Sequence, residues 1–164
     1  MRRSTTIGAV VPLALLNTAI TVMGQPSDAS LGSLLGTWKQ NLAKSTSNPG
    51  PPPQSNSSTW ESSEGGFKNT TDGIDAQGRA THTELRGKFD GKDYPLRGAP
   101  AANTTRAFRR IDDRTYEYVE KVDGKLMTTV RMVAPPDGKT PTNTSTGKNA
   151  QGQTVNNVTV WEKQ

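Results

Sequence analysis

Arginine and aromatic side chains that could bind a small ligand gather in the second half of the chain. The segment RAFRR, residues 106–110, places three arginines around Phe108. Because neighbouring residues of a β-strand point to opposite faces, Phe108 and Arg110 share one side. If Phe108 points into the interior of the fold, Arg110 also points inward, at or near an opening of that interior. A buried guanidinium needs a partner, which could be Glu117, Glu120 or the carboxylate of a ligand. The alternative interpretation is an ordinary solvated strand face.

Two tyrosines follow in the same alternating pattern. The segment TYEYVEKV, residues 115–122, places Tyr116, Tyr118 and Val122 on one face. An inward-facing tyrosine is either a core residue whose hydroxyl finds a partner or a wall residue that orients a ligand in a pocket. The candidate ligand-binding residues are therefore Phe108, Arg110, Tyr116 and Tyr118.

Side chains for catalysis and metal binding are sparse. His82 is the only histidine and the chain has no cysteine, so neither a multi-histidine site nor a thiolate site is predicted. His82 alternates with Glu84 and Arg86 on one strand face, which indicates a surface position. Asp112 and Asp113 are adjacent, an arrangement that suits capping of backbone donors in a turn better than shared acid–base work. No catalytic residue, metal or cofactor is predicted.

The elements that must position these side chains are short strands separated by turns. From Thr59 onward, turn signals lie mostly about 10 to 14 residues apart, which is typical of an all-β meander. Asp-Gly pairs suit tight hairpins because glycine adopts positive φ without strain. The quartets Asp75–Gly78 and Asn149–Gly152 indicate one turn chemistry used twice. We expect eight to ten strands.

Alternation along the expected strands places certain apolar residues on the same face. These are Leu85 with Phe89 in the segment 79–89, Leu126 with Val130 and Met132, and Val158 with Val160.

A single closed barrel is the predicted architecture. Closure removes the exposed edges that an open sheet of this length would leave. A hydrophobic fraction of only 30% indicates a thin core, which suits strands that each expose one face to water. We therefore expect an antiparallel meander barrel, with a flattened two-sheet sandwich as the alternative.

The first half of the domain contributes residues with structural roles. Gly36 and Trp38 lie in the motif Gly-Thr-Trp, and Trp38 is predicted to be the first core residue of the barrel. Trp60 is likewise predicted to be a packing residue. Residues 48–58, NPGPPPQSNSS, are predicted to be an ordered or semi-ordered crossing loop, because consecutive prolines cannot donate hydrogen bonds to a sheet.

Residues 1–24 have the pattern of a removable export signal. Arg2 and Arg3 precede a largely apolar stretch over residues 7–23, and cleavage is expected before Gln25. A membrane anchor is the alternative, disfavoured because the stretch is interrupted and already short of the about 20 apolar residues that a span needs. Cleavage would leave a flexible segment at residues 25–33 and a barrel domain at residues 34–164, located in the periplasm or secreted.

Several short motifs resemble a known group of proteins. GTWKQNLAKS at 36–45, the PGPPP that follows, DGKDYP at 90–95 and the terminal NAQGQTVNNVTVWEKQ are similar, in order and spacing, to small exported bacterial lipocalin-like (calycin-type) proteins of uncharacterised function. In such barrels the tryptophan closes one end. The resemblance covers nearly all of residues 34–164 and implies a barrel fold and export, with small-molecule binding by analogy. The last strand departs from true lipocalins, because it carries Lys163 but no arginine to cover the tryptophan.

These patterns favour an exported, non-enzymatic barrel that binds a small amphipathic or apolar molecule, which would enter near the Pro49–Pro53 loop. A barrel of about eight strands is just wide enough to hold one small ligand. The alternative is a cell-envelope structural or interaction module with a filled core, and a third hypothesis is a cyclase or isomerase.

Loss of the leader arginines lowers the formal net charge from +5 to +3, so nucleic acid is not an expected partner. No stable membrane anchor is expected after the leader is removed, and no oligomeric state is indicated.

Overall fold

The structure is a computed structural model that describes residues 31–164. The predicted export signal at residues 1–24 lies outside the described residues, as does most of the predicted flexible segment at 25–33. Leu31, within that segment, is fully buried, and a short 3-10 turn, η2 (Gly32–Leu34), follows it. The packed part of the chain therefore includes residues before the predicted domain start at residue 34.

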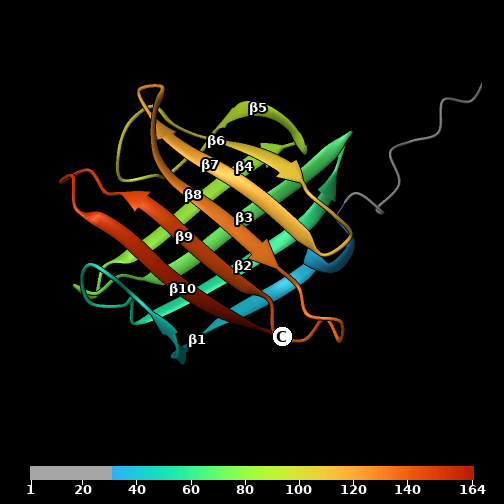
Figure 1. Cartoon of the computed structure of the whole chain (residues 1–164), viewed down its shortest axis with the longest axis horizontal. Coiled ribbons are helices and arrows are strands. Elements are labelled where there is room, and N and C mark those ends of the chain that lie inside the picture. The colour runs from blue at the N-terminus through green and yellow to red at the C-terminus, as the bar shows by residue number, and fades with distance from the viewer. Residues whose placement is uncertain (1–30) are drawn as a thin grey trace, which may run out of the picture.

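Ten antiparallel strands form one continuous sheet (Figure 1). The strands are β1 (Gly36–Thr46), β2 (Ser55–Ser63), β3 (Gly66–Ile74), β4 (Ala80–Gly87), β5 (Asp90–Pro95), β6 (Thr104–Arg110), β7 (Thr115–Val122), β8 (Lys125–Val133), β9 (Thr142–Lys148) and β10 (Thr154–Lys163). Their order in the sheet is β4-β3-β2-β1-β10-β9-β8-β7-β6-β5, so the first and last strands pair in the middle. The predicted all-β antiparallel meander of eight to ten strands is confirmed.

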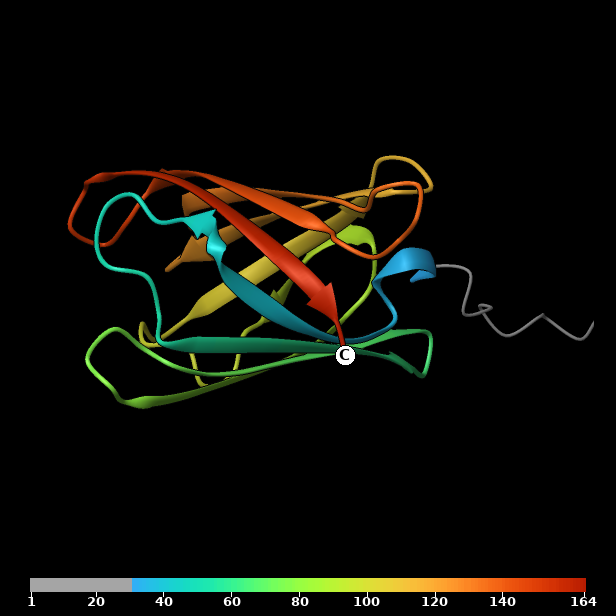
Figure 2. The same ribbon diagram turned by 90° about the horizontal axis from the view of Figure 1, so that it is seen from below.

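The sheet curls until its two edge strands nearly meet. The edge strand β4 and the segment after β5 are joined by one bridge, in which Glu84 and Arg97 exchange backbone hydrogen bonds of 3.0 and 2.9 Å. Figure 2 shows the green strands β2–β4 lying opposite the orange and red strands β9 and β10. The result is a nearly closed barrel, as the sequence predicts from the cost of exposed strand edges.

The turns between strands are held by short acidic and amide side chains. Oδ1 of Asp75 and Oδ1 of Asn149 each accept hydrogen bonds from the backbone N–H groups two and four residues later, at 2.9 to 3.0 Å. The predicted reuse of one turn chemistry is thereby confirmed. Oδ1 of Asp112 likewise accepts from the backbone N–H of Arg114 at 2.9 Å, which confirms its predicted capping role.

The turn η2 closes one end of the barrel. Leu31 and Leu34 are buried, and the backbone carbonyls of both residues are held by side chains from the strands. The Tyr116 hydroxyl donates to the Leu31 carbonyl at 3.0 Å, and the Trp38 indole Nε1 donates to the Leu34 carbonyl at 2.8 Å. An aromatic cluster lies beneath the turn, where the rings of Phe67 and Phe108 meet edge to face with centroids 5.0 Å apart. The aromatic cluster and η2 therefore close this end of the barrel.

Three sequence expectations about individual strands need correction. The predicted common face of Leu126, Val130 and Met132 is wrong for Leu126, which is 61% exposed. The pairing of β7 with β8 skips one residue at this point, and such a bulge reverses the alternation of inward and outward side chains. Strand β2 begins at Ser55, inside the predicted loop at 48–58. The segment predicted as one strand over residues 79–89 ends as a strand at Gly87, before Phe89.

Candidate ligand-binding cavity

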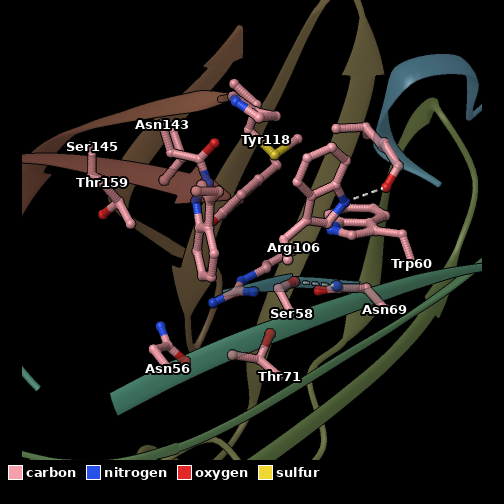
Figure 3. A pocket seen from close by; sticks show the side chains of 16 residues that line it. Asn56, Ser58, Trp60, Asn69, Thr71, Arg106, Tyr118, Asn143, Ser145 and Thr159 are labelled. Carbon is pink, nitrogen blue, oxygen red and sulfur yellow. Dashed lines mark hydrogen bonds between the residues drawn. The ribbon is translucent and has the colours of Figure 1, made fainter. Parts of the chain in front are cut away.

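A cavity of about 190 Å³ lies inside the barrel, beside the aromatic cluster (Figure 3). Its walls come from η2, from the segment before β9, and from all of the strands except the edge pair β4 and β5. Alternation along each strand determines which side chains reach it. On β10, for example, Thr159 and Trp161 line the cavity, whereas the intervening Val160 does not. The predicted shared face of Val158 and Val160 is therefore the outer face of the barrel.

One end of the cavity is apolar and deeply buried. Leu34, Trp38, Trp60, Met132 and Pro141 form this end, and every one of these residues is buried. The hydrogen bond from the Trp38 indole to the Leu34 carbonyl fixes one aromatic wall. This apolar end lies against η2, the turn that closes the barrel.

The other end of the cavity is polar and partly exposed. Its side chains are those of Asn56, Thr71, Asn143, Ser145 and Thr159, none of which is fully buried. In Figure 3, Asn56, Ser145 and Thr159 lie away from the blue turn η2, and Trp60 lies beside that turn. Because exposure rises toward the polar end, water and solutes reach the cavity from that side.

The proline-rich segment leads into the strand that lines the polar end of the cavity, β2. It connects β1 to β2 and ends just before Asn56, one of the cavity residues. The segment is tied down at both ends, because the backbone N–H of Asn48 donates to Asn157 Oδ1 at 2.7 Å and that of Gln54 donates to the Ile74 carbonyl at 2.8 Å. The crossing loop is therefore ordered, and it lies at the side from which solvent enters.

One charged side chain, Arg106, lines the cavity, and it is paired. Its Nε and Nη2 atoms each lie 2.8 Å from Oε2 of Glu120, the residue opposite it on β7. The guanidinium also stacks over the Tyr118 ring, 4.8 Å from the ring centroid. Burial acts to lower the pKa of Arg106, but the neighbouring Tyr118 and Glu120 outweigh it, so the net pKa is raised and the guanidinium stays protonated. The pair brings no net charge to the cavity.

Several polar side chains in the cavity form no hydrogen bond with any described residue. Ser58 and Asn69 are bonded to each other, since Asn69 Nδ2 donates to Ser58 Oγ at 2.9 Å. By contrast, no protein partner among residues 31–164 bonds the side chains of Thr71, Tyr118, Asn143, Ser145 and Thr159. The Trp161 indole Nε1 is also buried without an acceptor among these residues. The cavity therefore presents donors and acceptors that remain available to a ligand or to water.

The structure separates the four residues that the sequence suggests as ligand-binding. Tyr118 lines the cavity. Phe108 and Tyr116 are fully buried in the aromatic cluster and do not line it. Arg110 lies at the closed end of the barrel, where it donates to Asp113 Oδ1 at 2.8 Å and to the Asp112 carbonyl at 3.1 Å.

The expected inward-facing ion pair exists, but with a different arginine. Arg106 lies on the same strand face as Arg110, four residues earlier, and it is Arg106 that pairs with Glu120. Glu117, the other expected partner, is bonded by Arg109 on the outer face. The expectation that Arg110 pairs with Glu117 or Glu120 is therefore wrong, because Glu117 lies opposite Arg109 and Glu120 lies opposite Arg106 in the pairing of β6 with β7. Arg110 does not lie near an open mouth either, because η2 closes that end of the barrel.

The predicted structural residues are found at the barrel's first two strands. Gly36 begins β1 with a φ of +113°, a conformation that favours glycine. Trp38 and Trp60 are buried, at 4% and 7% exposure, and each contributes to a cavity wall as well as to the core. All three tryptophans of the chain therefore line the cavity, since Trp161 is the third.

The polar cavity residues are the part that sequence reasoning missed. Asn56, Ser58 and Thr159 look like solvent-facing residues because they are small and polar. A usable signal exists in their spacing, since Ser58 and Asn56 precede Trp60 by two and four residues and Thr159 precedes Trp161 by two. A residue two positions from a buried residue on a regular strand faces the same side.

The other groups that could do chemistry lie outside the cavity or are absent from residues 31–164. His82 Nδ1 lies 2.7 Å from Asp72 Oδ1, and both side chains are exposed, in keeping with the predicted surface position of the histidine. The described residues contain no group of three or more His, Asp or Glu side chains that could hold a metal ion. None of the helical segments in this part of the chain has the length and apolar character to cross a membrane.

Comparison with known proteins leaves the cavity as the basis for a functional assignment. The chain has no match among family models, curated proteins or solved structures.

Proposed function

We propose that this chain is an exported, non-enzymatic barrel protein that binds a small amphipathic or apolar molecule in its cavity. The observation that carries the proposal is a cavity of about 190 Å³ with an apolar end and a polar end. An apolar protein cavity of about 150 Å³ holds benzene, whereas drug-sized ligands occupy clefts of roughly 300 to 1,000 Å³. The expected ligand is therefore no larger than a single ring or a short chain.

The orientation of the ligand follows from the two ends. Its apolar part would contact Trp38, Trp60 and Met132 next to η2, and its polar part would face Asn143 and Thr159. Contact with the buried end removes apolar surface from water, at about 25 cal/mol per Å². The polar groups then fix which way round the molecule lies.

Binding without chemistry is proposed because of what the cavity walls are made of. The walls of the described cavity offer hydroxyl, amide and indole groups together with one paired guanidinium. Such groups orient a ligand, whereas acid–base catalysis works best with a group whose pKa lies near the operating pH. His82, the only histidine of the chain, lies on the outer surface instead.

Export and lipocalin-like kinship are further parts of the proposal. Export is supported by the arginines and the apolar stretch of residues 1–24. The kinship is supported by the single antiparallel barrel, with Gly-Thr-Trp at its first strand and Trp38 packed against the turn that closes one end.

Native mass spectrometry of the protein purified from its own host tests the proposal. We expect an additional mass under native conditions that is lost on denaturation. A cavity-filling variant, Ser145→Phe, should abolish that mass, because Ser145 lines the cavity. The matched control is Thr144→Phe, which adds the same ring to the exposed outer face of the same strand and should retain the mass.

A small soluble probe covers the case in which the natural ligand is lost during purification. p-Cresol should change the tryptophan fluorescence of the wild type and of Thr144→Phe but not of Ser145→Phe, because all three tryptophans line the cavity. If Ser145→Phe retains the additional mass, the bound molecule lies elsewhere and the proposal is wrong. If there is neither an additional mass nor a response to p-cresol, the cell-envelope module with a filled core becomes the better hypothesis.

A further inference from the structure

We infer that the cavity selects neutral single-ring molecules that carry a hydroxyl or amide group, in preference to carboxylates, amines or hydrocarbons of the same size. This inference rests on the proposed binding function and specifies the chemistry of the ligand. Its basis is the distribution of satisfied and unsatisfied polar groups in the cavity walls.

The unsatisfied groups are neutral and can both donate and accept. Tyr118, Ser145 and Thr159 offer hydroxyls and Asn143 offers an amide, and none of these groups has a hydrogen-bond partner among the described residues. Hydroxyls and amides on a ligand can match both functions of such groups. A hydrocarbon cannot, so it would displace water from them without replacing its hydrogen bonds, which costs affinity.

The Trp161 indole is a different case. Trp161 lines the cavity and the residue is 8% exposed, but its Nε1 atom is buried and has no acceptor among residues 31–164. Because neither water nor a ligand in the cavity contacts this buried nitrogen, the inferred selectivity rests on the hydroxyl and amide groups of Tyr118, Asn143, Ser145 and Thr159.

The Arg106–Glu120 pair disfavours charged ligands. A carboxylate that approached the guanidinium would meet a charge that Glu120 already balances through Nε and Nη2 of Arg106. An ammonium group would face the protonated guanidinium instead. An ion that is buried without a partner of its own pays a large desolvation cost, so the neutral molecule of equal size binds better.

A series of benzene derivatives tests this preference at constant size. The probes are benzamide, benzyl alcohol, toluene, benzoate and benzylamine, titrated into the purified full-length protein by calorimetry, with tryptophan fluorescence to locate binding in the cavity. We expect benzamide and benzyl alcohol to bind at least tenfold more tightly than benzoate and benzylammonium, and more tightly than toluene.

The outcomes separate this inference from the proposed function. If toluene or an ion binds as well as benzamide, with a tryptophan response, the cavity binds ligands but the inferred selectivity is wrong. If no probe binds, the inferred selectivity is wrong, and the additional mass described under Proposed function decides whether the cavity binds another class of molecule. The ranking is measured on the wild type and so does not depend on the folding of any variant.

A charge-neutralising variant tests the reason for the preference. Glu120→Gln leaves the guanidinium of Arg106 without a carboxylate, so we expect benzoate to gain at least tenfold in affinity relative to benzamide. The matched control is Glu117→Gln, which removes a carboxylate paired with Arg109 on the outer face of the same strand and should leave the ratio unchanged. An unchanged ratio in a folded Glu120→Gln protein would contradict the role of the ion pair.

Discussion

Truncation of Phe108 provides the sharpest test of where the core of this barrel lies. The Phe108 ring is fully buried and packs against the rings of Phe67 and Tyr118, with centroid distances of 5.0 and 4.8 Å. Two further rings, those of Trp60 and Phe89, contact it edge to face at 5.9 and 6.2 Å. Phe108→Ala therefore removes the centre of a cluster of five rings.

The magnitude follows from this burial. Truncation of a buried phenylalanine to alanine costs about 3 to 5 kcal/mol, and loss of favourable ring pairs adds to the cost of the cavity, so we expect about 4 kcal/mol or more. Phe108→Leu keeps most of the volume and should cost about 1 to 2 kcal/mol. A native domain is stable by only about 5 to 15 kcal/mol, so the alanine variant loses a large part of its stability.

Equilibrium unfolding in urea, followed by circular dichroism, measures these losses. Leu126→Ala is the control, because Leu126 is 61% exposed and its truncation should change the free energy of unfolding by no more than about 0.5 kcal/mol. A cost below about 2 kcal/mol for Phe108→Ala, or one equal to that of the control, would refute the assignment of this ring to the core. Phe108 would then have to be reconsidered as a residue that contacts a ligand.

Two further predictions concern the closure of the barrel and its response to acid. Gly98→Ala should destabilise the protein by several kcal/mol more than Gly91→Ala in thermal unfolding. Both glycines have positive φ, +76° and +75°, but only at residue 98 would the added methyl meet a backbone carbonyl, that of His82, at 2.1 Å. Equal losses of stability would show that the backbone does not approach residue 98 so closely. The pKa of Glu162 is held below its ordinary value of 4.5, chiefly by the hydrogen bond from Asn41, so its contribution to stability is present above that pH and lost as the pH falls through the lowered pKa. Glu162→Gln should therefore flatten the decline of the urea midpoint below about pH 5, and an unchanged decline would contradict the assignment.

The strands that could be predicted are those in which local and global signals agree. The sequence predicts a strand over residues 115–122, and these residues form β7 with the same bounds, because the apolar alternation and the flanking turns both indicate it. Strand β2 starts earlier than expected because Ser55–Ser58 contain no apolar residue, so that only pairing with β1 and β3 makes them a strand. The bulge that exposes Leu126 is equally invisible in the sequence, since it depends on how β8 pairs with β7.

The candidate site is harder to predict than the fold because a cavity inverts the usual pattern. Polar residues on a strand are ordinarily assigned to solvent, yet Ser145 and Thr159 face inward because the barrel interior here is not filled. Which arginine faces the cavity, Arg106 or Arg110, is hard to predict for the same reason. The two arginines share a strand face, and only the packing of Leu31 and Leu34 over one end determines which of them faces a closed end and which faces the cavity. A site of this kind depends on where the core ends, which is a property of the whole barrel rather than of any one strand.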